Sequence, residues 1–288
     1  MKTSVLSLMV LIGGLAAPLL AGEILFEAGI EYSAAGDEHL QLNLARPKEV
    51  KEGAKLPAVI CIHGGGFRAG KRERWDGLCK QLAENDYVAM TVTYRLAPKH
   101  QFPAAVHDVK AAVRWLKANA AKYHVDPERI GVVGDSAGGH LVQYLGVTAD
   151  VPSLEGTGGN PGHSSRVACV VNYYGPSDLT KSYGKSVDAA EVLPLWLGGD
   201  ATKEHKKHIL ASPLYWVTPT AAPTLLIHGT EDKYVAYEQA TWIHEKLKAS
   251  EVEVELLTLE GAGHGFKGDD AVKAEKAMLE FFEKHLKK

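Results

Sequence analysis

Short apolar runs alternate with longer amphipathic stretches along most of the chain, and this alternation constrains the fold more than any other feature. Residues 57–62 form a continuous apolar run that ends at three glycines, as strands buried on both faces do. Residues 103–123 instead carry Ala, Val, Trp and Leu at spacings of three and four, which is typical of one helix face. Such alternation predicts an α/β fold, with a mostly parallel central sheet flanked by helices.

The same patterns give the approximate bounds of the elements. We expect strands at 40–44, 57–62, 87–93, 129–133, 167–173, 224–227 and 252–259. We expect helices at 75–85, 103–123, 136–147, 237–249 and 270–287. The first strand alternates with polar residues and ends at Arg46-Pro47, so it is expected to be an antiparallel edge strand. Residues 176–215 break the rhythm and predict a small lid insertion over the C-terminal edge of the sheet, where open α/β sheets place their sites.

The first 22 residues have the layout of a secretory signal peptide. A single Lys precedes an apolar stretch of roughly fifteen residues, which is followed by Ala21, Gly22 and the acidic Glu23. The alternative is a membrane anchor, but the stretch is short for a span and lacks a basic flank. The sequence predicts a signal peptide at 1–22, one domain at 23–288, a secreted or periplasmic location and no stable membrane insertion.

Charge and cysteine content exclude several classes of function. The chain carries 32 Lys and Arg against 35 Asp and Glu, a net charge of −3, without a long basic run. A dedicated binder of nucleic acid or anionic membranes would carry a basic excess, so no nucleic-acid partner is expected. Cys61, Cys79 and Cys169 form no CxxC pair, which argues against a zinc site or a disulfide scaffold. We therefore expect no metal site.

Residues 134–138 read Gly-Asp-Ser-Ala-Gly and lie between an expected strand and an expected helix. A tight turn there needs glycines, because larger side chains would clash around a strained central residue. The turn presents the Ser136 hydroxyl at a helix N-terminus, which has free N–H groups and a partial positive charge. An ordinary glycine-rich turn is the alternative. The context favours Ser136 as a nucleophile.

A second glycine-rich segment, His-Gly-Gly-Gly-Phe at 63–67, directly follows the buried strand. Backbone N–H groups in such a loop can approach a ligand closely and stabilise the negative oxygen that develops during acyl transfer. The expected donors are Gly65, Gly66 and Ala137. A phosphate-binding loop is the alternative, but neither GxGxxG nor GK[ST] follows. His63 is expected to brace the loop.

The base for Ser136 must be selected by position, because the chain has 13 histidines. His264 lies in a glycine-rich loop between the last expected strand and the last expected helix, which places it at the C-terminal edge of the sheet. His140 and His228 are expected to be structural. The sequence therefore predicts His264 as the general base.

A carboxylate should orient the imidazole and stabilise its charged form. Asp232 follows the strand at 224–227 and is the candidate, with Glu231 as the alternative. The order Ser136, Asp232, His264 is the one expected of an α/β-hydrolase triad. Asp135 is expected to support the site, and Asp108 to be a solvated or helix-capping charge.

Four motifs in this order resemble those of α/β-hydrolase-fold carboxylesterases of the hormone-sensitive-lipase type. They are HGGGF at 63–67, GDSAGG at 134–139, HGTED at 228–232 and GHGF at 263–266. The stretch from Val92–Pro98 through Phe102–Ala105, with Asp108, resembles the same group. The GDSAGGH segment and Tyr173–Asp178 are similar to segments of its secreted relatives, which include esterases that act on acetyl or feruloyl groups of plant polysaccharides. The resemblance runs from about Ile30 to the C-terminus. It implies the α/β-hydrolase fold and a Ser-His-Asp acyl-enzyme mechanism without a cofactor.

The hormone-sensitive-lipase type usually carries a substantial N-terminal helical cap, and this sequence departs from that pattern. Residues 23–56 are expected to form strands, so the lid should be small or come from residues 176–215. An open site favours short-chain acyl esters on an exposed alcohol, as a small molecule or a polysaccharide. Trp75, Tyr94 and Trp196 are expected to line the substrate site.

Two other functions are compatible with the same motifs. A serine peptidase of the prolyl-oligopeptidase type shares the fold and triad but normally carries a large N-terminal domain, and none fits this sequence. A non-catalytic binding protein on a hydrolase scaffold usually loses a triad residue or an oxyanion glycine, and this chain retains them all.

Overall fold

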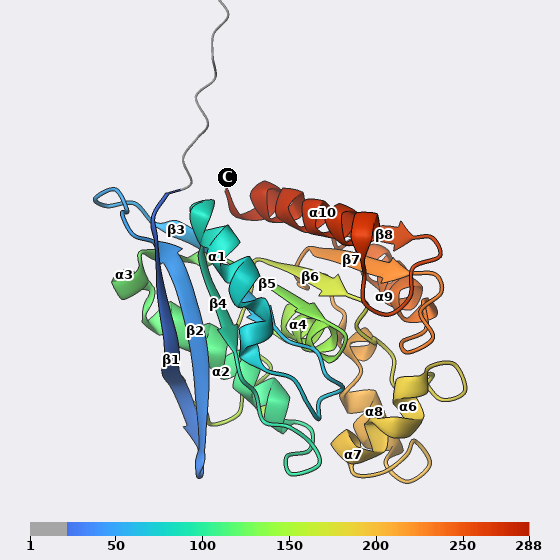
Figure 1. Cartoon of the computed structure of the whole chain (residues 1–288). Helices are drawn as coiled ribbons and strands as arrows, with labels where there is room; N and C mark the ends of the chain where they lie inside the picture. Colours follow the sequence, from blue (N-terminus) through green and yellow to red (C-terminus); the bar gives the residue numbers. More distant parts are fainter. Residues whose placement is uncertain (1–21, 288) are drawn as a thin grey trace, which may run out of the picture.

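The computed structural model describes residues 22–287, apart from the side chain of Asp188. The predicted signal peptide thus lies outside the described residues, Gly22 excepted. One eight-stranded sheet runs through this part of the chain in the order β1-β2-β4-β3-β5-β6-β7-β8 (Figure 1). The β1–β2 and β2–β4 pairs are antiparallel, and all the other pairs are parallel. The expected α/β fold with a mostly parallel sheet is confirmed.

The observed bounds of the elements are as follows. The strands are β1 (Ile24–Ala35), β2 (Glu38–Pro47), β3 (Leu56–Ile62), β4 (Val88–Val92), β5 (Val125–Asp135), β6 (Cys169–Tyr173), β7 (Thr224–Gly229) and β8 (Val254–Leu259). The α-helices are α1 (Asp76–Glu84), α2 (Ala104–Ala118), α3 (Ala120–Tyr123), α4 (Ala137–Val147), α5 (Pro152–Glu155), α6 (Val187–Glu191), α7 (Leu193–Leu197), α8 (His205–Leu210), α9 (Glu238–Ala249) and α10 (Gly268–Leu286). Two 3₁₀ turns, η1 (Arg72–Trp75) and η2 (Pro213–Trp216), precede α1 and follow α8.

Helices cover both faces of the sheet, which explains why the central strands are apolar without interruption. Side chains alternate across a strand, so Val59 and Cys61 of β3 enter the core beneath α1 and α10. Ile60 and Ile62 enter the opposite core, beneath α2 and α4 (Figure 1). Both faces are therefore buried, and each position must be apolar. Among the described residues, no helix is long and apolar enough to cross a membrane.

Two expectations about the elements are wrong. The strand predicted at 40–44 is antiparallel but is not at the edge, because β1 pairs along its outer side. The register between β1 and β2 shifts twice, which breaks the two-residue alternation that would have revealed β1. The helix predicted at 103–123 is divided into α2 and α3 at Asn119, which adopts a non-helical backbone conformation.

Residues 176–215, predicted as an insertion, form the short helices α6, α7 and α8, which lie together at one end of the sheet (Figure 1). Trp196 of α7 is fully buried and anchors this segment. Its ring stacks on Phe67 at a centroid distance of 3.8 Å and meets His140 edge-on at 5.2 Å. The insertion is thereby packed against the loop that follows β3.

His140 on α4 lies fully buried beneath this insertion, where its Nε2 donates to the carbonyl of Ala211 at 2.7 Å. Burial disfavours the charged imidazolium and lowers the pKa of His140 to about 4, although the Ala211 hydrogen bond opposes this shift. In the unfolded chain the same group is protonated below its ordinary pKa of 6.5. Between pH 4 and pH 6.5, unfolding is therefore accompanied by the uptake of a proton at His140.

Acidification is expected to destabilise the fold through this residue. The free energy of unfolding decreases as the pH is lowered, wherever the unfolded state binds more protons than the folded state. Because one pKa unit corresponds to about 1.4 kcal/mol, His140 accounts for a loss of about 3 kcal/mol between pH 6.5 and pH 4. Urea unfolding of the wild type and of His140→Gln at pH 7.0 and 4.5 measures this loss. The variant should lose less stability than the wild type, and equal losses would contradict the assignment.

Candidate active site

Ser136 lies at the sharp turn between β5 and α4, in a backbone conformation that side chains rarely adopt (φ 53°, ψ −119°). Its neighbours must be small for this turn to form. A Cβ added to Gly138 would lie 2.1 Å from the carbonyl oxygen of Ile62, too close for any other residue. The turn thus stores local strain in order to present the Ser136 hydroxyl, as nucleophile elbows do.

His264 and Asp232 approach Ser136 from the loops that follow β8 and β7. The Ser136 hydroxyl is 3.0 Å from His264 Nε2, and His264 Nδ1 donates to Asp232 Oδ2 at 2.8 Å. Because β5, β7 and β8 are parallel, their C-terminal ends meet at one edge of the sheet and bring these loops together. The three residues form one hydrogen-bonded chain.

Asp232 is held by four groups. The backbone N–H groups of Tyr234 and Val235 each donate to Oδ1 at 2.9 Å, while His264 and His228 approach Oδ2 at 2.8 and 3.3 Å. Burial would raise the pKa of Asp232, but hydrogen bonds from His228 and His264 outweigh it and hold the pKa well below its usual range. The carboxylate is therefore ionised. His228, expected to be purely structural, also contacts this carboxylate.

The loop after β3 offers N–H groups beside Ser136. Gly65 and Gly66 have positive φ angles of 120° and 59°, and a Cβ on Gly65 would lie 2.2 Å from the carbonyl oxygen of Ala69. Within residues 22–287, the N–H groups of Gly65, Gly66 and Ala137 donate to no protein acceptor. Free donors in this arrangement could bind a negatively charged oxygen.

Side chains beneath this loop hold its shape. His63 Nδ1 donates to the carbonyl of Gly64 at 2.8 Å, and burial lowers the pKa of His63 despite that bond. Asp135 accepts the N–H of Gly64 at 2.8 Å and pairs with Arg74 at 3.0 Å. The bracing role expected of His63 and the supporting position expected of Asp135 agree with these contacts.

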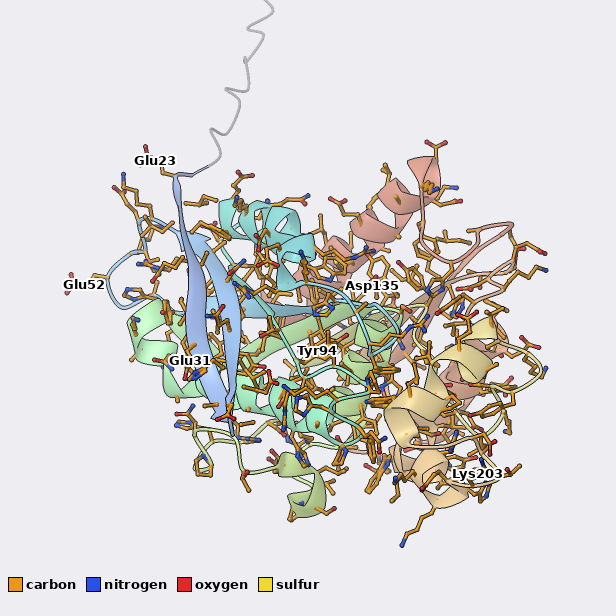
Figure 2. All side chains as sticks on the ribbon, turned by 60° about the horizontal axis from the view of Figure 1, so that its bottom comes forward. Glu23, Glu31, Glu52, Tyr94, Asp135 and Lys203 are labelled. Carbon is orange, nitrogen blue, oxygen red and sulfur yellow. The ribbon has the colours of Figure 1, made fainter. Side chains whose placement is uncertain are left out.

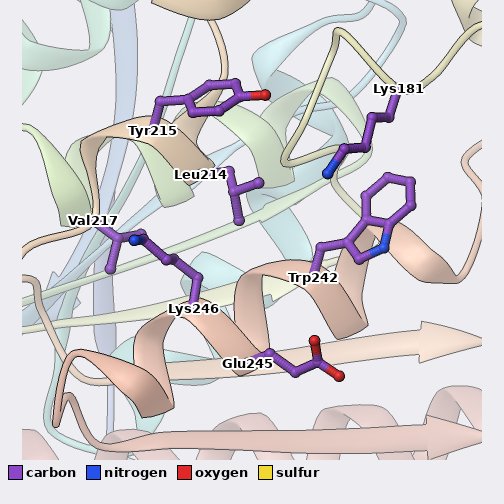
Figure 3. Close-up of a pocket in the computed structure, with 7 residues that line it drawn as sticks. All are labelled: Lys181, Leu214, Tyr215, Val217, Trp242, Glu245 and Lys246. Carbon is purple, nitrogen blue, oxygen red and sulfur yellow. The ribbon is translucent and has the colours of Figure 1, made fainter.

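A cavity of about 410 Å³ opens at Ser136 and His264, and Arg68, Arg74 and Tyr234 contribute to its wall. A larger cavity of about 480 Å³ lies between η2 and α9 (Figure 3). Its lining residues are Lys181, Leu214, Tyr215, Val217, Trp242, Glu245 and Lys246. No serine, cysteine or histidine is among these residues, whereas Ser136 and His264 both line the other cavity, so the chemistry selects the cavity at Ser136.

Two of the three aromatic residues expected to line the substrate site are core residues instead. Tyr94 lies inside the molecule with only 4% exposure, stacks on His63 and donates its hydroxyl to the carbonyl of His63 at 2.9 Å (Figure 2). Trp196 is fully buried against Phe67. Trp75 lines a separate cavity of about 300 Å³ beside the first.

Asp108 is also not the solvated or capping charge that the sequence predicts. Its side chain is buried and accepts three hydrogen bonds from the Arg95 guanidinium at 2.7–3.0 Å. It also accepts the Arg95 backbone N–H at 2.8 Å. A buried carboxylate needs a compensating positive charge, and Arg95 provides it. The ion pair thereby joins the segment after β4 to α2.

Two tyrosines that lie beside His264 were not identified as site residues from the sequence. The ring of Tyr174 meets the His264 ring at 4.7 Å, and Tyr234 lies against it at 5.0 Å. Tyr174 directly follows β6, so its place at the C-terminal edge of the sheet was a usable signal. Its left-handed backbone (φ 42°) is uncommon for a bulky side chain.

Comparisons with known proteins show what this chain is similar to. The BD-FAE family model matches residues 42–247. Esterase LipC of Mycobacterium tuberculosis is 35% identical over 238 residues, which are 80% of this chain and 58% of that protein. This chain spans only 52–58% of the length of the first three curated relatives it matches.

Two solved structures are also similar. A truncated carbohydrate esterase from gut microbiota superposes with a TM-score of 0.80 at 27% identity, covering 92% of this chain and 97% of that one. The propionate-bound Est2 esterase of the planctomycete Thermogutta terrifontis gives a TM-score of 0.75 at 28% identity, with 92% and 94% coverage.

Proposed function

Since the chain belongs to the BD-FAE family and has the α/β-hydrolase fold of the hormone-sensitive-lipase type, we propose that it is a carboxylesterase for short-chain acyl esters. The observation that carries this proposal is the hydrogen-bonded chain from Ser136 through His264 to Asp232, which faces free N–H groups in an open cavity. Nucleophile, base and orienting carboxylate are thus assembled before any substrate arrives.

In the proposed first step, Ser136 Oγ attacks the ester carbonyl carbon while His264 Nε2 accepts the hydroxyl proton. The carbonyl oxygen becomes an oxyanion, which accepts hydrogen bonds from the N–H groups of Gly65, Gly66 and Ala137. The C–O bond to the alcohol then breaks, and His264 gives the proton that it took from Ser136 to the departing alcohol oxygen. An acyl-enzyme and a free alcohol result.

In the second step, a water molecule attacks the acyl-enzyme and gives a proton to His264. The bond to Ser136 breaks, the carboxylic acid leaves and the serine recovers its proton. Asp232 stays ionised throughout and stabilises the transient imidazolium. The step uses groups of this chain and water alone.

The acyl group is proposed to be short, and the alcohol to be part of a carbohydrate. A cavity of about 410 Å³ has room for a small acyl group together with part of the alcohol. The similar Est2 structure contains propionate, and the other similar structure is a carbohydrate esterase. Acetyl or feruloyl groups on plant polysaccharide are the proposed natural targets.

Chain-length dependence tests this proposal. On p-nitrophenyl esters from acetate to laurate, kcat/KM is expected to peak at two to four carbons and to fall at least tenfold by twelve. A long acyl chain that does not fit the cavity displaces the ester carbonyl from Ser136, and misplacing the reacting groups lowers the rate. Peak activity at twelve carbons would contradict the short-acyl specificity. Cleavage of a peptide bond in preference to a matched ester would favour the peptidase alternative.

A further inference from the structure

We propose that the cavity beside the one at Ser136 is the subsite for the alcohol part of the substrate, and that it holds one neutral sugar ring. This inference rests on the proposed esterase function. The cavity measures about 300 Å³, and its wall includes Trp75, Leu78, Tyr174, Phe266 and Met278. That volume lies at the lower end of the usual range for small-molecule sites, about 300–1,000 Å³, which suits a single ring.

The two cavities are adjacent and share a wall. Arg74 and Tyr174 line both of them. Arg74 comes from η1 and Tyr174 directly follows β6, so residues of two separate segments lie where the cavities adjoin. The proposed substrate, bound to Ser136, extends past these two residues into the second cavity.

The position of this cavity relative to His264 assigns it to the alcohol. Tyr174 contacts the His264 ring at 4.7 Å, and Phe266 contacts Tyr174 at 4.9 Å. The departing alcohol oxygen must lie beside His264, because it receives the proton from that imidazole. The chain attached to that oxygen is thus directed toward Tyr174 and Phe266.

The acyl group is directed elsewhere. Its carbonyl oxygen faces the loop of Gly65 and Gly66, and a Cβ on Gly66 would lie 3.1 Å from Val192 of the insertion. The oxyanion loop therefore borders the insertion, whereas the second cavity is bordered by α1 and α10. The carbonyl oxygen, the alcohol oxygen and the acyl chain point in three different directions from the ester carbon. With the first at the oxyanion loop and the second beside His264, the acyl chain takes the remaining direction.

The lining of the second cavity matches the two kinds of surface on a sugar. A pyranose or furanose ring presents C–H groups on its faces and hydroxyl groups at its edges. Trp75, Tyr174 and Phe266 provide aromatic surface for the faces, and Gln81 and Glu275 provide polar groups for the edges.

The charges favour a neutral sugar over a uronic acid. Arg74 is already paired with Asp135 at 3.0 Å. Gln81 Nε2 donates to Glu275 Oε1 at 2.6 Å, which leaves a carboxylate at the far end of the cavity. A ligand carboxylate would meet the Arg74 guanidinium, whose charge is already compensated by Asp135, and the Glu275 carboxylate, which would repel it. A hydroxyl group can bond to either partner without that penalty.

Ala271→Trp tests the proposal, because it places a large side chain in this cavity without altering Ser136, His264 or the oxyanion loop. On methyl 2-O-acetyl-β-D-xylopyranoside, kcat/KM is expected to fall at least tenfold. On ethyl acetate, whose alcohol is too small to reach the cavity, kcat/KM should stay within twofold of wild type. Val272→Trp is the matched control, because Val272 is 68% exposed on the same helix turn and does not line the cavity.

Three results would overturn the proposal. One is undiminished activity of Ala271→Trp on the sugar acetate, and a second is an equal loss on both acetates. The third is a loss confined to methyl 4-hydroxycinnamate, which would place an aromatic acyl group in the cavity instead.

Binding separates this proposal from the esterase function itself. Methyl β-D-xylopyranoside should bind to Ser136→Ala in calorimetry, and at least tenfold more weakly once Ala271→Trp is added. Failure of the wild type to cleave any ester would overturn the esterase function but leave this binding experiment valid. Absence of binding in an active enzyme would overturn the subsite alone.

Discussion

Replacing Ser136 by Ala is expected to lower kcat on p-nitrophenyl acetate by five to six orders of magnitude, about the loss seen when the nucleophile of a serine hydrolase is removed. The variant keeps the cavity, the base and the free N–H groups, so substrate binding should change little. What disappears is the acyl-enzyme, because no other hydroxyl lies within hydrogen-bonding distance of His264 Nε2 in the described part of the chain. KM should therefore stay within a few-fold of wild type.

A matched serine variant makes this result specific. Ser164→Ala removes an exposed hydroxyl that donates to Asp150 and does not line the cavity at Ser136, so this variant should behave like the wild type. A fluorophosphonate probe should label the wild type and Ser164→Ala but not Ser136→Ala. Residual activity above one hundredth in Ser136→Ala would show that another group is the nucleophile. Absence of both turnover and labelling in the wild type would instead support a binding protein on a hydrolase scaffold.

The fold and the meeting of Ser136, Asp232 and His264 were predictable because each leaves a local signal with one physical cause. A continuous apolar run such as 57–62, closed by glycines, is typical of a strand that is covered on both faces, and such a strand implies helices on either side. The C-terminal ends of parallel strands then meet at one edge. Loops after three strands that carry Ser136, Asp232 and His264 must therefore lie close together, although 128 residues separate the first from the last.

Other features had no such signal. Three large aromatic residues lie near glycine-rich or insertion segments: Tyr94, Trp196 and Trp75. The sequence pattern does not distinguish an aromatic side chain that packs in the core from one that lines a cavity. Whether each ring faces solvent depends on which tertiary neighbour covers it, such as Phe67 over Trp196. The burial of Asp108 depends in the same way on Arg95, which supplies a compensating charge thirteen residues earlier.

Asp232→Asn is expected to lower kcat by about four orders of magnitude, comparable to the same change in a well-studied serine protease. The side chain is nearly isosteric, so the fold should survive. The loss arises because the variant presents a hydrogen-bond donor to His264 where the carboxylate presents an acceptor. Asp232 Oδ1 accepts the N–H groups of Tyr234 and Val235, and an asparagine must keep its oxygen at that position to satisfy them. Its NH₂ group is then forced toward His264 and His228.

An NH₂ group at that point can only donate, so His264 Nδ1 must become the acceptor and the ring proton must move to Nε2. An imidazole with its proton on Nε2 cannot remove the proton from Ser136, which lies 3.0 Å from that nitrogen. Glu231→Gln supplies the control, because Glu231 is exposed, pairs with Lys233 at 3.2 Å and should change kcat less than twofold. Steady-state kcat at pH 8 compares the two variants. A severe loss in Glu231→Gln with a mild one in Asp232→Asn would move the orienting carboxylate by one residue, against the four contacts that hold Asp232 in place.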